Sequence, residues 1–76
     1  MAELPVISGR KAARAFERTG WRIARRESSH IVMTKAGSVL TLSIPDHREL
    51  DRGLLRSQIR KAGITVDEFV ELLKRK

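Results

Sequence analysis

The stretch Ser28-Ser29-His30-Ile31-Val32-Met33 decides the fold of this chain of 76 residues. Its two serines are typical of a tight turn, and the apolar residues after the histidine are typical of a buried β-strand. We therefore expect a turn followed by a strand over residues 31–34. His30 lies at the head of that strand, where its side chain could move protons near neutral pH.

The sequence before this turn predicts one helix and one strand. Ser8 is a suitable N-cap and Gly20 a suitable C-terminal stop, so we expect a helix over residues 9–19. Alternating apolar and basic side chains then predict a half-buried strand over residues 21–27. This strand would form the first arm of a hairpin.

The sequence after the second strand predicts a second hairpin. Residues 35–38 contain the small and polar residues of a loop, and residues 39–44 alternate as a third strand does. Pro45 is expected to end this strand because proline cannot donate to a sheet ladder. The side chains expected to face the core are Leu40, Leu42 and Ile44.

Two further helices are expected after the third strand. Apolar residues at helical spacing predict a helix that stops at Gly63, and Thr65 and Glu68 form a capping box that begins another. We find no repeat or linker and expect a single domain over residues 1–76. The predicted fold class is α+β, in the order α-β-β-β-α-α, with a three-stranded antiparallel sheet covered by helices on one face.

The charge of the chain favours a polyanionic partner. Sixteen Lys and Arg residues outweigh nine Asp and Glu residues, which gives a formal net charge of +7. Arginines recur every four residues on two of the predicted helices, a spacing that places them on one helix face, either as solvated charges or as phosphate ligands. A membrane surface is the alternative partner for such charge. The two series are Arg10, Arg14 and Arg18, and Arg52, Arg56 and Arg60.

Several classes of protein are disfavoured by the composition. The chain has no cysteine, which removes disulfides and thiolate metal sites. Its three aromatic residues are expected in the core, so base stacking on exposed rings is not supported. No apolar run is long enough to span a bilayer, and the first six residues are unlike a signal peptide, so we expect a cytoplasmic protein. We expect no metal and no small-molecule cofactor.

The chain contains two histidines, His30 and His47, and both are expected near one end of the sheet. If the second hairpin closes as predicted, residue 30 lies opposite residues 43–44, and His47 follows a few residues later. Spacing alone leaves two interpretations open. The imidazoles could form an acid/base couple, or they could be a polar cap on the end of the sheet.

The order of several short motifs resembles that of the HicA toxins. The resemblance extends over about residues 5–73 and is specific as a set, although each motif alone is common. The motifs are Gly9-Arg10-Lys11, Gly20-Trp21, Arg26-Glu27-Ser28-Ser29-His30, Ile44-Pro45-Asp46-His47, and the segment 51–65.

This resemblance implies an mRNA interferase of a type II toxin-antitoxin system, with a fold like that of double-stranded-RNA-binding domains and a HicB antitoxin as partner. The family's catalytic histidine follows a Gly-Ser pair, and here His30 follows Ser28 and Ser29. Serine therefore stands where the family has a glycine, a residue that tolerates positive φ. Ser28, Ser29 and His47 are expected to support the site.

The mechanism that we expect is attack of an RNA 2′-hydroxyl on its own phosphate, with His30 as general acid or base and without metal. The side chains expected to contact phosphate are Arg25, Arg26, Lys35, Arg56 and Arg60. Two other classes remain open: a non-catalytic RNA-binding module, and a basic domain that docks on an acidic protein.

Overall fold

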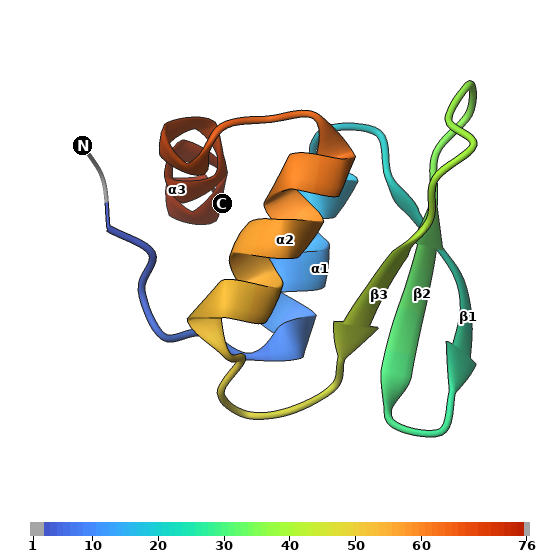
Figure 1. Cartoon of the computed structure of the whole chain (residues 1–76), viewed down its shortest axis with the longest axis horizontal. Helices are drawn as coiled ribbons and strands as arrows, with labels where there is room; N and C mark the ends of the chain where they lie inside the picture. Colours follow the sequence, from blue (N-terminus) through green and yellow to red (C-terminus); the bar gives the residue numbers. More distant parts are fainter. Residues whose placement is uncertain (1–2, 76) are drawn as a thin grey trace.

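Three helices and three strands follow one another in the expected order in the computed structural model, which describes residues 3–75. The strands form one antiparallel sheet in the order β1-β2-β3 (Figure 1). The predicted α+β class is thereby confirmed, whereas the expected boundary 1–76 includes residues outside the described part. The elements are α1 (Gly9–Glu17), β1 (Arg22–Glu27), β2 (His30–Thr34), β3 (Leu42–Pro45), α2 (Arg52–Ala62) and α3 (Val66–Lys74).

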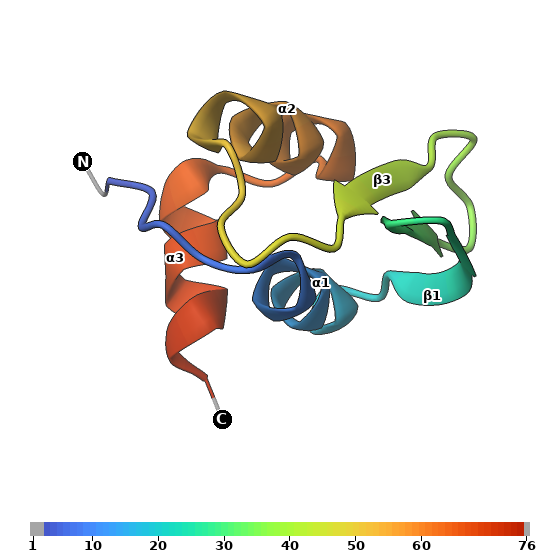
Figure 2. The ribbon, with the colours of Figure 1, turned by 90° about the horizontal axis from the view of Figure 1, so that it is seen from below.

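The helices pack on one side of the sheet and against each other (Figure 2). α1 contacts all three strands, α2 packs against β3, and α3 packs against α1 and α2. The rings of Phe16 and Phe69 lie 5.0 Å apart at the centre of this arrangement, and Trp21 is also buried, so all three aromatic residues belong to the core as expected. None of the helices in residues 3–75 has the length and apolar character needed to cross a membrane.

The helix ends are set by the local signals that the sequence contains. The Ser8 hydroxyl accepts a hydrogen bond from the Lys11 N–H at 3.1 Å, which caps α1. The capping box of Thr65 and Glu68 begins α3, and Gly63 ends α2 with φ of 78°. α1 is shorter than the predicted 9–19 because its last hydrogen bonds give way to a turn after Glu17.

The third strand begins later than the predicted residue 39. Val39 is 98% exposed and Leu40 is 49% exposed, so the expectation that Leu40 faces the core is wrong. The cause is local, because the Ser38 hydroxyl accepts a hydrogen bond from the Leu40 N–H at 3.1 Å and donates one to the Leu40 carbonyl at 3.3 Å. The ladder with β2 therefore starts only at Leu42.

The first strand is exposed along its whole length, which corrects the prediction of a half-buried strand. β1 is an edge strand that pairs with β2 alone, and even Ile23 is 37% exposed. The apolar residue that suggested alternation, Trp21, is buried but precedes the strand. An edge strand rich in arginine resists pairing with other chains.

A two-residue turn connects β1 to β2, as the serine pair predicted. Glu27 and His30 are paired across the ladder, which leaves Ser28 and Ser29 as the loop. Ser28 has φ of 49°, and among the described residues it is the only one other than glycine with positive φ. Positive φ at the first of two loop residues is the pattern of a type II′ turn, where glycine is the usual residue.

The start of α1 lies against the chain that leaves β3. The Gly9 N–H donates a hydrogen bond to the His47 carbonyl at 2.9 Å. A Cβ atom at Gly9 would lie 1.9 Å from the Pro45 carbonyl oxygen, so no other residue fits without movement of the backbone. This contact fixes the end of the sheet relative to α1.

Replacing Gly9 with alanine should lower the free energy of unfolding by at least about 2 kcal/mol, because the new methyl group overlaps backbone atoms that cannot rotate away. Gly53→Ala is the matched control. Its Cβ atom would meet only the Asp51 carboxylate, at 3.1 Å, and no backbone atom from another element within 4 Å. Chemical denaturation of both variants measures the difference, and equal effects would contradict the role assigned to the Gly9 contact.

Replacing Ser28 with valine should cost about 1–2 kcal/mol of unfolding free energy, because a β-branched side chain is strained at positive φ. Ser29→Val should cost less, since Ser29 has no positive φ. Ser28→Gly should be close to neutral, because relief of strain is offset by greater freedom of the unfolded chain. Thermal melts of the three variants give this order, and a reversed order at the two serines would refute the turn assignment.

Candidate active site

His30 is the first residue of β2 and its side chain is exposed. Ile31 and Met33 face the buried core, so the alternation of the strand places His30 on the opposite face of the sheet. Most side chains on that face are exposed, and we call it the open face. Val32 and Pro45 are buried on this face, Thr34 is half-buried, and the remaining paired residues are exposed: Arg22, Arg25, Glu27, His30 and Ser43.

A carboxylate lies directly across the ladder from the histidine. Glu27 and His30 are paired residues of β1 and β2, and residues opposite each other carry their Cβ atoms about 5 Å apart on the same face. Arg25 joins this group through an ion pair of 2.8 Å between its Nε and the Glu27 Oε1. Imidazole, carboxylate and guanidinium groups are thus presented together to solvent.

The sequence analysis did not single out Glu27. The signal was nevertheless present, since a two-residue turn at Ser28-Ser29 requires that Glu27 and His30 face each other. The turn also anchors β3, because the Ser29 carbonyl accepts a hydrogen bond from the Asp46 N–H at 2.6 Å. The two serines therefore shape and hold the turn that presents the histidine.

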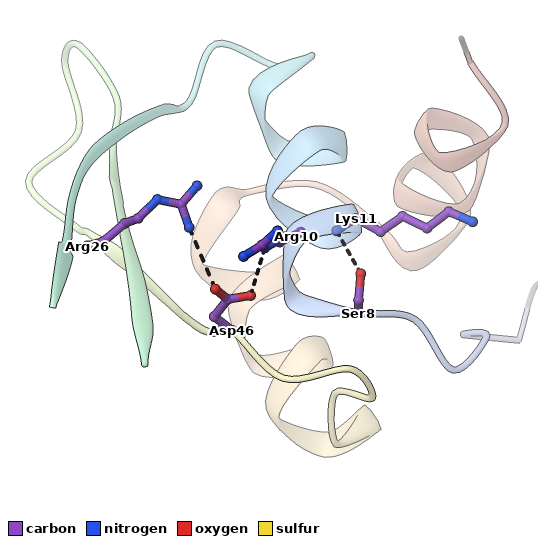
Figure 3. Close-up of polar contacts among 5 residues, drawn as sticks. All are labelled: Ser8, Arg10, Lys11, Arg26 and Asp46. Atoms are coloured by element: carbon purple, nitrogen blue, oxygen red, sulfur yellow. Dashed lines mark hydrogen bonds and ion pairs between the residues drawn. The ribbon is translucent and has the colours of Figure 1, made fainter. Parts of the chain in front are cut away.

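Arg25 and Arg26 point to different faces of the sheet, although they are neighbours in sequence. Arg26 is paired with buried Ile31, so it faces the side on which α1 packs. There the Arg26 Nη1 lies 3.7 Å from the Asp46 Oδ2, while the Arg10 Nε lies 3.3 Å from the Asp46 Oδ1. Figure 3 shows the two arginines converging on this carboxylate from β1 and α1.

His47 follows two residues after Pro45, the ladder partner of His30. The ladder ends at the pair of His30 and Pro45, and the chain then turns toward α1, where the His47 carbonyl binds the Gly9 N–H. Both histidine side chains are exposed, and no hydrogen bond connects them in the described chain. His47 thus contributes to the fold through its backbone, and its side chain lies outside the ladder.

Lys35 is distant from His30. It follows the last residue of β2, whereas His30 is the first residue of that strand, so about 16 Å of extended chain separates them. Lys35 instead lies near Gly20 at the end of α1. The phosphate contact predicted for Lys35 would therefore be made at the other end of β2 from His30.

The predicted arginine series behave differently on the two helices. On α1, Arg10 is paired with Asp46, and Arg18 donates a hydrogen bond to the Leu72 carbonyl at 2.7 Å, which ties α1 to α3. On α2, Arg56 and Arg60 are exposed, while the buried Gln58 accepts a hydrogen bond from the Ser43 N–H at the edge of β3. The arginines of α2 are therefore exposed, and the structure describes no ion pair for them, in contrast to Arg10.

Within residues 3–75, no group of three or more histidine, cysteine, aspartate or glutamate residues is arranged to hold a metal ion. The chemistry that the described residues can provide at the open face is proton transfer by His30 and Glu27. Charge stabilisation by Arg25 accompanies it.

Comparison with known proteins identifies the chain at the family level. No curated protein matches it. The family model described as HicA toxin of bacterial toxin-antitoxin matches residues 9–64, from the first residue of α1 to just beyond the end of α2. This region contains the whole sheet, the serine turn and His30. The chain therefore belongs to the HicA toxin family of bacterial toxin-antitoxin systems.

Proposed function

We propose that this protein is an endoribonuclease toxin that cleaves mRNA, with His30 as a catalytic acid/base group. The observation that carries the proposal is the position of His30: exposed at a hairpin end on the open face, opposite Glu27, in a toxin-family domain with a net charge of +7. Cleavage of mRNA would stop translation, which is a direct route to toxicity.

RNA can be cleaved by its own 2′-hydroxyl. The hydroxyl oxygen attacks the adjacent phosphorus, a base takes the hydroxyl proton, and an acid gives a proton to the departing 5′-oxygen. The products are a 2′,3′-cyclic phosphate and a 5′-hydroxyl. His30 and Glu27 supply the two proton-transfer groups, and Arg25 stabilises charge on the phosphorane. DNA lacks the nucleophile and should remain intact.

The wider basic surface would hold the RNA backbone. Arg25 lies on the open face, and Arg26 lies on the other side of the same strand. Arg56 and Arg60 add exposed cations on α2, and Lys35 adds a half-buried one at the far end of β2. Guanidinium groups bind phosphate oxygens through paired hydrogen bonds, so the arginines are the stronger ligands.

Membership of a toxin-antitoxin family implies an antitoxin partner, and we propose one of the HicB type. His30, Glu27 and Arg25 are exposed on the open face, so inhibition by a partner requires only that this face be covered. Acidic residues of the partner would pair with the arginines around His30. Both proteins would act in the cytoplasm, where mRNA is translated.

Replacing His30 with alanine should lower the rate of RNA cleavage by about 10²- to 10⁴-fold, because one proton transfer is lost. The fold and RNA binding should persist, since the exposed imidazole contributes little to either. His47→Ala is the control and should retain most activity. The measurement is cleavage of a labelled RNA in EDTA, with the product ends identified and circular dichroism recorded for both variants. Full activity of His30→Ala would refute the proposal.

Replacing Glu27 with glutamine should lower kcat at least about tenfold with little change in KM, because the amide cannot transfer a proton but can still accept the hydrogen bond from Arg25. Glu49→Gln, an exposed change outside the sheet, is the matched control. If Glu27 only holds Arg25 in place, Glu27→Gln will cleave RNA at the wild-type rate.

A further inference from the structure

A groove lies between α1 and β1, on the opposite side of the sheet from His30. It encloses about 500 Å³, a volume within the range of small-molecule sites. Ala13 and Ile31 form an apolar floor, and Ile23 adds an apolar wall from β1. The remaining lining residues are Ser8, Arg10, Lys11, Arg14, Glu17 and Arg26.

The rim of this groove is strongly basic. Four of its lining residues are cationic, and Glu17 is the one carboxylate among them. Arg10 and Lys11 lie in the first turn of α1, which contains no acidic residue. Cations are disfavoured at that end of a helix because the helix dipole is positive there. The Asp46 carboxylate offsets this cost at Arg10, and the excess of cations on the rim still favours a further anion nearby.

A carboxylate from outside the groove lining links the arginines of its two sides. The Asp46 carboxylate contacts Arg10 on α1 and Arg26 on β1, at 3.3 and 3.7 Å. Each arginine uses one nitrogen for this contact (Figure 3), and a guanidinium has five N–H donors. Their side chains remain 75% and 53% exposed. Asp46 therefore orients both guanidinium groups while leaving donors for a second anion.

We propose that this groove binds one nucleotide of the RNA, with its phosphate on Arg10, Arg14 and Arg26 and its base or ribose on the apolar floor. The inference rests on the proposed function for the identity of the polyanion. β1 is a free edge, with Arg25 on one face and Arg26 on the other. An RNA strand that crosses this edge reaches both His30 and the groove.

The test measures binding of a short single-stranded RNA to the full chain carrying His30→Ala, which keeps the RNA intact. Adding Arg10→Ala and Arg14→Ala should weaken binding about tenfold or more in about 0.1 M salt and lower the slope of log affinity against log salt by about one to two. The charge-matched control adds Lys61→Ala and Lys74→Ala on α2 and α3, and should weaken binding less than about threefold.

A second variant tests the apolar part of the groove. Ile23→Ala should weaken RNA binding about threefold without changing the salt slope, because it removes apolar contact and no charge. Circular dichroism and thermal melts of each variant show that the fold is retained.

Three outcomes overturn the inference. They are equal RNA binding by the groove and control variants, a groove variant that loses antitoxin binding but keeps RNA binding, and an unchanged affinity in Ile23→Ala. The groove is then not a nucleotide site, and in the second case it belongs to an acidic protein partner. Failure of the wild type to cleave RNA would refute the proposed enzyme activity but not the groove, because the binding test requires no cleavage.

Discussion

The close approach of Gly9 to the chain leaving β3 is the contact on which the remaining architecture depends. A hydrogen bond from Gly9 to the His47 carbonyl, and the absence of any side chain at residue 9, bring the start of α1 against Pro45. Pro45 is in turn the ladder partner of His30. This backbone contact therefore fixes how the start of α1 lies against the end of the sheet that carries the histidine. The same approach brings Arg10 within reach of Asp46.

The hairpin of β1 and β2 presents different chemical groups on its two faces. Glu27 and His30 share the open face, where both are exposed to the proposed RNA substrate. Arg26, on the other face, turns toward Asp46 and α1. Alternation along two short strands thus places the proposed proton-transfer groups and the proposed anion site on opposite faces of the sheet without a second domain. A domain of this size has one small core and little internal space, so a surface site suits it better than an enclosed pocket.

Features encoded by adjacent residues could be predicted from the sequence, and features that depend on distant residues could not. The cap at Ser8, the stop at Gly63 and the turn at Ser28-Ser29 rest on side chains next to the backbone that they affect. The exposure of β1 depends on how far α1 extends over the sheet, and no local sequence pattern predicts that extent. The late start of β3 has a local cause, since the Ser38 hydroxyl accepts a hydrogen bond from the Leu40 N–H. Alternation at Val39 and Leu40 nevertheless predicts a strand, so the two local signals conflict. Arg10, Arg26 and Asp46 meet only through the tertiary fold.

The arginines of β1 serve two requirements at once. An unpaired edge strand invites association with other chains, and charged side chains are a common protection against it. Arg22, Arg25 and Arg26 provide that protection along an edge on which every residue is exposed. The same charges attract a polyanion to the edge that separates His30 from the groove. Protection of the free edge and the proposed capture of RNA therefore favour the same residues. An antitoxin that covers this edge would pair with the exposed strand and neutralise its charges. Binding of the partner would then also block the proposed active site.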